Sequence, residues 1–343
     1  MLTWVSANPV QKPDACSDQR SVQFHHQNAP AHGLTPNFRI TSLSPNTKPP
    51  RTTPAYQSAR QPDLALFDTP HIASCPITTA PPVPPDLSAG GAPNTWPQVD
   101  AANLATLEPS FAPIRLKLTG VVTPKRLSHL PKSVRQLRMS ECFGVNAKAL
   151  KSLRERQLQL VDVSGLSLDA KCAQELAKYP ALTALNLAGN RVGDAGAAAL
   201  GESQSLQALN ISGNGIGKLG GKALGRSQTL TTLIAQDNAI GGDLLADEAL
   251  VAFGKNPSLK YLGLAKNGIE CAYSLAQNQY IETLDLRDNS LLSLDLLDML
   301  RMPALKHLHL SEFKARLPSS SVMQLVATNV DITFYVNPAD HQA

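Results

Sequence analysis

The second half of the chain carries apolar residues in a pattern that returns at a fixed interval. The clearest copies read LTALNLAGN from Leu182 and LQALNISGN from Leu206, a distance of 24 residues. Apolar residues stand at the first, fourth and sixth positions, and Asn stands at the ninth. Because side chains alternate between the two faces of a strand, the fourth and sixth positions predict a short strand whose apolar side chains point inward. Asn at the ninth position can hydrogen-bond backbone groups where the chain turns away.

The pattern can be followed through nine copies. Six of the eight intervals between them are 24 residues, one is 29 and one is 22. In the first copy Cys142 takes the place of Asn, as a small buried substitute, and a possible first turn with Leu116 and Leu118 precedes it. Self-similarity at this period is typical of stacked repeats. The copies begin at Val134, Leu158, Leu182, Leu206, Leu230, Leu259, Ile281, Leu305 and Asn329.

The stretch after each Asn predicts a helix. The segments GDAGAAALGE and GKLGGKALGR place small residues and a Leu on one face, which lets a helix pack closely against the next repeat. We therefore expect residues 106–337 to form an α/β leucine-rich-repeat solenoid, a right-handed horseshoe of about nine repeats with a period of 24. Strands line the concave face of such solenoids.

Composition separates this region from residues 1–105. Of 26 Pro, 18 precede residue 110, and no Glu occurs before Glu108. A Pro-, Ser- and Thr-rich segment without a period buries too little apolar area to offset its conformational entropy. We expect a long disordered N-terminal tail over residues 1–105 and a short C-terminal tail over residues 338–343. The five Cys form no C-x-x-C pair, and this odd number suits a reducing compartment.

The repeats are similar to the ribonuclease-inhibitor type, through G-x-x-G-x-x-A-L after the Asn. More closely, they resemble the GALA and related leucine-rich-repeat effectors of plant-pathogenic bacteria of the Ralstonia and Xanthomonas kind. The resemblance implies a type III secreted effector that acts inside a host cell. The N-terminal segment agrees with an unfolded secretion signal, since it is rich in Ser and Pro and its first acidic residue is Asp14. An ordinary flexible tail and an acid-poor transit peptide are the alternatives.

Relatives of this class often carry a ubiquitin-ligase element. No L-P-x-E F-box helix stands between residues 1 and 130, and Cys16-Ser17-Asp18 has the C-x-D spacing of a second ligase class without a domain around it. Neither G-x-S-x-G, nor a P-loop, nor H-E-x-x-H occurs. The sequence therefore favours a binding protein without catalysis, cofactor or metal. A ligase or ligase adaptor with an unrecognised catalytic element or a partner chain is the alternative, and a cytosolic enzyme inhibitor is a third possibility.

Specificity should come from the variable positions of the strands, which we expect to point outward on the concave face. They are small and neutral in the middle repeats and larger or charged toward the C-terminal third. His307 and His309 are two residues apart, a weak metal signal without a third ligand. From Arg115 to Arg156 the chain also carries eleven Lys or Arg against two Glu, which favours general electrostatic steering or solubility. The candidate contact residues are Arg135, Arg138, Ile234, Lys260, Tyr261, Asp285, Arg287, His307 and His309.

These residues suit a host protein as the partner, since Tyr and Arg are enriched at protein–protein hot spots. Neither a small-molecule substrate nor a nucleic acid is expected. The basic stretch lacks interleaved aromatic residues for base stacking, which argues against a nucleic acid. No apolar run is long enough for a transmembrane helix. We expect a monomer.

Overall fold

All the strands in the described part of the chain lie in one parallel sheet. The computed structural model describes residues 40–41, 96–108, 110–242, 248–291, 293–311 and 330–335. The sheet follows chain order from β2 to β12, and β1 is added beyond β12. The strands are β1 (Ile40–Thr41), β2 (Gln98–Asp100), β3 (Arg115–Val121), β4 (Gln136–Phe143), β5 (Leu160–Asp162), β6 (Ala184–Asn186), β7 (Ala208–Asn210), β8 (Thr232–Ile234), β9 (Tyr261–Gly263), β10 (Thr283–Asp285), β11 (His307–Ser311) and β12 (Asp331–Tyr335).

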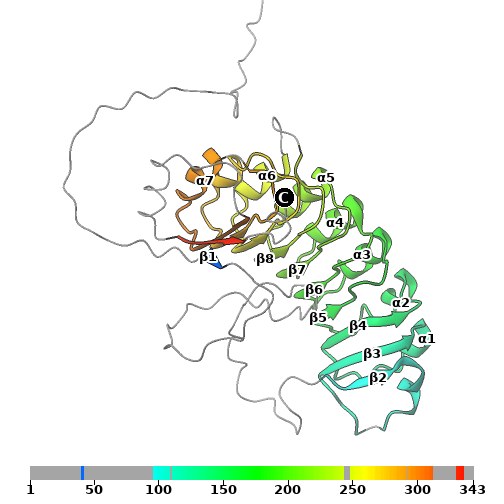
Figure 1. Cartoon of the computed structure of the whole chain (residues 1–343). Coiled ribbons are helices and arrows are strands. Elements are labelled where there is room, and N and C mark those ends of the chain that lie inside the picture. Colours follow the sequence, from blue (N-terminus) through cyan, green and yellow to red (C-terminus); the bar gives the residue numbers. More distant parts are fainter. Residues whose placement is uncertain are drawn as a thin grey trace, which may run out of the picture.

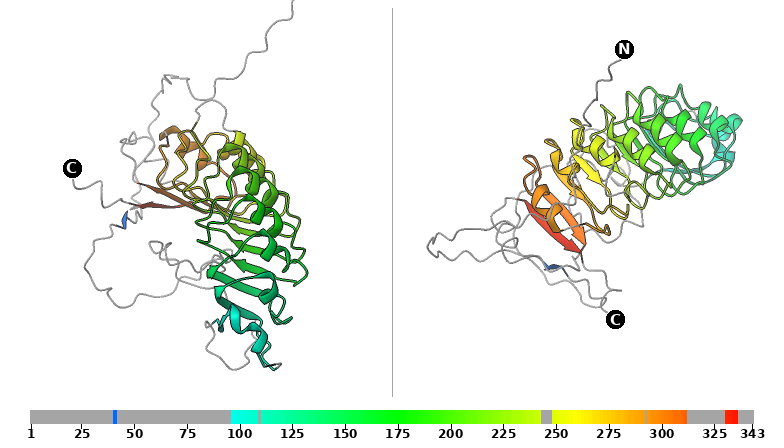
Figure 2. Two further views of the ribbon diagram at one scale, coloured as in Figure 1. Left: turned by 90° about the vertical axis from the view of Figure 1, so that its right-hand side faces the viewer. Right: turned by 90° about the horizontal axis from the view of Figure 1, so that it is seen from above.

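The helices form a second layer that covers one face of this sheet. Figure 1 shows the sheet curving, with the strands along the inner side of the arc and the helices along the outer side. Seen from above, the helices follow one another in a row (Figure 2). The predicted α/β leucine-rich-repeat solenoid is therefore confirmed. The helices are η2 (Ala101–Thr106), α1 (Pro124–Leu127), α2 (Ala147–Lys151), α3 (Ala170–Leu176), α4 (Gly193–Gly201), α5 (Lys218–Gly225), α6 (Glu248–Lys255), η3 (Leu275–Gln277) and α7 (Ser293–Met299).

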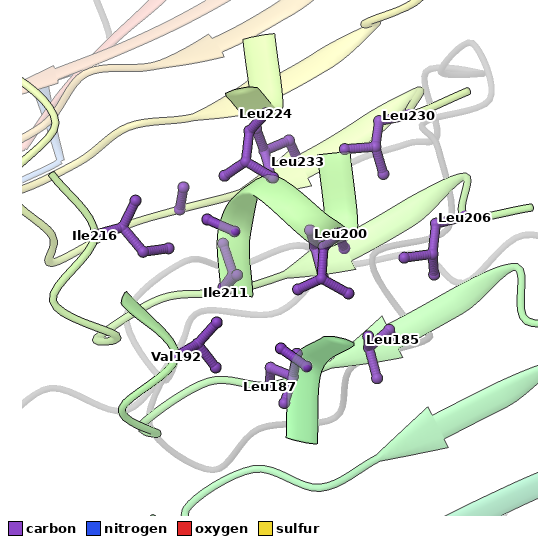
Figure 3. Close-up of a cluster of buried hydrophobic side chains, with 14 of the residues drawn as sticks. Leu185, Leu187, Val192, Leu200, Leu206, Ile211, Ile216, Leu224, Leu230 and Leu233 are labelled. Carbon is purple, nitrogen blue, oxygen red and sulfur yellow. The ribbon is translucent and has the colours of Figure 1, made fainter. Parts of the chain in front are cut away.

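The register of the sheet repeats the register of the sequence pattern. Each strand from β4 to β12 begins two residues after the corresponding copy of the pattern. Leu209 at the centre of β7 pairs with Leu185 of β6 and Leu233 of β8. All three side chains are fully buried between the sheet and the helices. Figure 3 shows how leucines of successive repeats meet helix residues such as Leu200 and Leu224 in this layer.

The Asn at the ninth position ties neighbouring repeats together. The Oδ1 of Asn214 accepts a hydrogen bond from the backbone N–H of Val192 at 3.2 Å. Its Nδ2 donates to the carbonyls of Leu187 at 2.9 Å and Ile211 at 3.1 Å. In the first copy the buried Cys142 Sγ donates to the Leu118 carbonyl at 3.3 Å. Burial raises the pKa of the Cys142 thiol to about 12, so this Cys is a neutral structural group.

The folded region begins earlier than the sequence predicts. Strand β2 pairs with β3, and the Asp100 side chain caps η2 by accepting a hydrogen bond from the Ala102 N–H at 2.7 Å. Ala101 and Leu104 are buried in the main core. The predicted boundary between residues 105 and 106 is therefore wrong, because β2 and η2 cover the first edge of the solenoid. The other residues of the predicted tail, apart from 96–105 and β1, lie outside the described residues, as do the secretion signal and residues 338–343.

Two neighbouring repeats depart from the regular period. The 29-residue repeat that begins at Leu230 contains α6 and the five residues 243–247, which are not described. In the 22-residue repeat that follows, the three-residue η3 replaces the usual α-helix. The side chain of Asn278 joins η3 to α6 by donating to the carbonyls of Phe253 and Asn256, each at 2.8 Å. The shortened repeat is thus hydrogen-bonded directly to the end of α6.

Candidate protein-binding face

A second apolar cluster lies on the sheet face that points away from the helices. The strand positions that alternate with the core leucines supply it, because successive side chains of a strand point to opposite faces. Trp96, just before β2, packs against this cluster. It runs across five successive strands, from β5 to β9, and is separate from the main core. Its members are Leu160, Ala184, Ala208, Ile234 and Tyr261.

Three of the predicted contact residues on this face are buried. Ile234 is 3% exposed, Tyr261 is 8% exposed and Asp285 is 1% exposed. The sequence predicts that these side chains point outward, and the structure agrees, because they lie on the sheet face opposite the helix layer. However, on the inner side of a curved sheet, neighbouring strands bring their side chains together. These three residues therefore face away from the core and are nevertheless buried by their neighbours.

At the N-terminal end of the face, charged residues are paired. The guanidinium group of Arg138 lies over the Trp96 ring, 4.8 Å from its centroid. The Arg138 Nε also lies 3.1 Å from the Oδ2 of the buried Asp162. The neighbouring Arg135 donates from Nη1 to the carbonyl of Lys132 at 2.7 Å. Arg138 thus orders the face around Trp96, and its charge is already balanced by Asp162.

A similar pair stands at β10. Arg287 donates from Nε to Asp285 Oδ1 at 2.9 Å and from Nη2 to Asp285 Oδ2 at 2.7 Å. Gln236, two repeats away, also donates to Asp285 Oδ2 at 3.3 Å. Such a bidentate Arg–carboxylate contact fixes the orientation of both side chains. The predicted residues Asp285 and Arg287 therefore form one nearly buried, neutral unit.

The two histidines of β11 lie beside this pair. His307 pairs with Thr283 and His309 pairs with Asp285 across the β10–β11 ladder, while Leu308 between them enters the core. The Nδ1 of His307 lies 3.6 Å from Asp331 Oδ2 on β12. Among the described residues, no group of three or more His, Cys, Asp or Glu is arranged to hold a metal ion.

The accessible part of the C-terminal third is its rim. Lys260 lies 3.7 Å from Glu282 Oε1, and Lys306 lies 2.5 Å from Glu282 Oε2. The hydrogen bond from Lys306 lowers the pKa of the Glu282 carboxyl. The Lys260 ammonium also lies 5.8 Å from the centre of the Tyr280 ring. With side chains that are 43% and 34% exposed, Lys260 and His307 are the best presented of the predicted residues in this third.

The middle of the face, on β6 and β7, holds none of the predicted contact residues. Asn186 and Asn210 stand two residues after the small residues Ala184 and Ala208 on β6 and β7 and are fully buried. Their Oδ1 atoms accept from the backbone N–H groups of Ala188 and Ser212, at 3.1 and 3.2 Å. Among the described residues, no acceptor lies within hydrogen-bond distance of their Nδ2 groups. Trp96 is not among the predicted contact residues either, because it stands in a Pro-rich segment and no repeat marks it.

The basic stretch is largely engaged in structural contacts. Lys117 pairs with Glu141 at 2.6 Å, and Arg154 pairs with Glu175 at 2.5 Å. Arg156 donates to the carbonyls of Leu130 and Ser128. Much of the positive charge at this end therefore stabilises the first repeats.

In the described part of the chain, no helix is long and apolar enough to cross a membrane.

The comparison with family profiles identifies the repeat itself. The profile of the family described as "Leucine Rich repeat" matches residues 180–201 and 202–225. This chain contains leucine-rich repeats. The two matched segments hold β6 with α4 and β7 with α5, the most regular part of the solenoid.

Two solved structures from Listeria monocytogenes are similar to the leucine-rich-repeat chain. Internalin C2 is 19% identical, with 62% of this chain and 84% of that chain covered and a TM-score of 0.46. An internalin, inlF, is also 19% identical, with 69% and 63% covered and a TM-score of 0.48. The chain thus spans less than two thirds of this second internalin. No curated protein matches the sequence significantly.

The histidine on the concave face gives a pH-dependent prediction. Burial lowers the pKa of His309. The charge of Asp285 opposes this shift, whereas Arg287 and His307 add to it. A folded-state pKa below the unfolded value of about 6.5 means that the unfolded chain binds the proton more readily. The stability contribution of His309 is therefore present above about pH 6.5 and is lost as the pH falls below it. We expect His309→Gln to reduce the fall in melting temperature between pH 7.5 and pH 5.5.

The carboxylates of Asp169, Glu175 and Glu282 also have lowered pKa values, but their effect belongs to a more acidic range, below their ordinary values. Thermal melts of the wild type, His309→Gln and the control His129→Gln between pH 7.5 and pH 5.5 separate the effect of His309 from the effect of these carboxylates. An unchanged slope in His309→Gln would show that burial of this imidazole does not control the pH dependence.

Proposed function

We propose that the chain is a secreted bacterial effector whose leucine-rich repeats bind a host protein on the concave face, without catalysis of its own. The observation that carries this proposal is the continuous face from Trp96 to Tyr261 and on to the rim at Lys260 and His307. Its members change from Leu160 through Ala184 and Ala208 to Ile234 and Tyr261, whereas the core positions repeat the same apolar residues. A surface that varies on a constant scaffold is suited to recognition of one partner.

The chemistry of the face also suits a protein partner. Aromatic and Arg side chains are enriched where interface energy concentrates, and Trp96, Arg138, Tyr261 and Arg287 provide both kinds.

The test of recognition replaces the accessible rim. Lys260→Ala combined with His307→Ala is expected to weaken capture of the partner at least tenfold in a pull-down from plant extract followed by a binding titration. The matched control is Lys171→Ala with His129→Ala, which removes the same residue types at exposed positions on α3 and after α1. Equal binding by both variants would exclude the C-terminal rim and move attention to Arg135 and Arg138.

Delivery and catalysis are tested separately. A translocation reporter fused to residues 1–100 is expected to reach the host cell only when the type III system is intact. A reporter that stays inside the bacterium would contradict the effector role and would favour an inhibitor within its own cell. Purified chain in a ubiquitination assay with activating and conjugating enzymes is expected to be inactive. Robust autoubiquitination would instead establish the ligase alternative.

A further inference from the structure

The outer, helical surface holds a hollow of about 520 Å³ beside α5 and α6. These two helices pack against each other on the convex side of the solenoid (Figure 1). Gly225, Val251 and Ala252 supply apolar lining to the hollow, and Lys222, Arg226 and Lys255 contribute cationic side chains to it. This surface is remote from the strand face described above, because the main core and the sheet lie between them.

The hollow coincides with the break in the repeat period. It lies at α6, in the 29-residue repeat, and the shortened 22-residue repeat follows with η3 in place of an α-helix. Helix α6 therefore has a full helix beside it on only one side, at α5. Hollows also lie between α3 and α4 and between α4 and α5, in regular repeats, but each of these is lined by only one cationic side chain, whereas the hollow beside α6 is lined by three.

The charges around the hollow are unequal. Lys222 forms an ion pair with Glu248, so these two charges balance each other. Arg226 and Lys255 are exposed and form no ion pair with any other described residue. Glu202 lines an adjoining hollow together with Arg226, but no ion pair joins them. Two cations therefore remain available beside an apolar surface.

Apolar side chains are exposed next to these cations. Val251 on α6 is 37% exposed, and Leu219 at the start of α5 is 70% exposed. Residues three or four positions apart share one face of a helix. Val251 and Lys255 therefore lie together on α6. Lys222 on α5 and Arg226, the residue that directly follows this helix, are also four positions apart, so the two cations beside α5 lie on one side. On α6 the face that carries Lys255 also carries the exposed Val251.

We propose that this hollow binds a short acidic segment of a partner protein. An apolar side chain of that segment packs on Val251 and Ala252, and its carboxylates meet Arg226 and Lys255. Arg binds carboxylates through two parallel hydrogen bonds, which adds direction to the attraction. The lining contains no aromatic ring on which a nucleic-acid base could stack. The site is additional to the concave face and does not depend on its function.

The experiment measures binding of three fluorescein-labelled ten-residue peptides to the full chain by fluorescence anisotropy. Each peptide contains two Leu in a Ser/Gly background and zero, two or four Asp. Affinity is expected to rise with the number of Asp and to fall with added salt. Arg226→Glu with Lys255→Glu is expected to weaken binding of the four-Asp peptide about tenfold or more, because attraction becomes repulsion. A peptide with four Lys should then bind this variant better than the wild type.

The matched control is Lys151→Glu with Lys171→Glu, the same charge change at exposed positions on α2 and α3. It should keep at least half of the wild-type affinity. A second variant, Val251→Gln, tests the apolar contact without a charge change and should weaken binding severalfold. Equal binding of neutral and acidic peptides, or equal loss in the control, would overturn the proposal.

Other ligand classes are also separated by the test. Tighter binding to phosphatidylserine vesicles or to a single-stranded oligonucleotide than to the four-Asp peptide would overturn the proposal in favour of that class. The concave-rim variant Lys260→Ala with His307→Ala should bind the acidic peptide like the wild type. Loss of peptide binding in that variant would place the peptide on the concave face instead.

Discussion

Leu209→Ala is expected to lower the free energy of unfolding by about 2–5 kcal/mol, since a buried Leu loses transfer energy and leaves a cavity. Leu209 is fully buried at the centre of β7, with Leu185 and Leu233 beside it on the adjacent strands. Neighbouring repeats fix the spacing of these strands through the Asn ladder, so the cavity cannot close easily. Because a solenoid is stabilised by contacts between adjacent repeats, this change weakens two interfaces at once.

Chemical denaturation of the wild type and Leu209→Ala measures this loss. The control is Gln207→Ala, two residues earlier in the same repeat, where the side chain is exposed and the backbone bonds are retained. The control should change stability by about 0.5 kcal/mol or less. Equal denaturation midpoints of Leu209→Ala and wild type would contradict the inward orientation of the fourth position of the repeat.

The sequence alone predicts the register of this fold because one physical rule is repeated many times. Every strand from β4 onward begins at the same offset from its leucine pattern, and every described ninth-position Asn from Asn190 to Asn289 donates from its side chain to a backbone carbonyl of the preceding repeat. A single weak copy, such as the one with Cys142, is then identified by its neighbours. Stacked repeats must match, so regularity in one copy constrains the next.

Features that occur only once in the chain were not predictable in the same way. Strand β2 and η2 follow a Pro-rich segment, and the composition of that segment hides the short alternation that leads to Ala101 and Leu104. Trp96 enters the concave face only because β2 brings it next to Arg138. No period relates these residues to the repeats, and their contacts depend on where the chain meets the first edge of the sheet.

For the candidate face, the sequence predicts which strand positions face away from the core, but not the contacts that their side chains make. Pattern identifies which strand positions face away from the core, and it correctly separates Ile234 and Tyr261 from the leucines. It does not reveal that Arg287 turns back onto Asp285, two residues earlier, or that Arg138 reaches Asp162 in the next repeat. These pairings depend on side-chain conformations and on strand spacing. They convert expected free charges into neutral, ordered pairs.

A substitution at the irregular repeat should reveal a constraint that the sequence pattern does not show. Gly254→Ala in α6 is expected to cost about 3 kcal/mol, near the upper end of the usual range for overpacking. A Cβ at this position would lie 2.0 Å from the carbonyl oxygen of Ser274, just before η3. That oxygen is backbone, so no side-chain rotation can relieve the contact. The short η3 allows this approach, and the two hydrogen bonds from Asn278 to Phe253 and Asn256 hold the backbones together.

In an ordinary exposed helix, Gly→Ala stabilises by up to about 1 kcal/mol, because Ala has the higher helix propensity. The sign of the effect therefore distinguishes a close backbone contact from a merely permissive helix. Thermal melts of Gly254→Ala should show a clear loss of stability, whereas Val251→Ala, on the exposed face of the same helix, should stay within about 0.5 kcal/mol of the wild type. A stabilised Gly254→Ala variant would mean that α6 and η3 do not approach this closely, and that the 22-residue repeat stacks like the others.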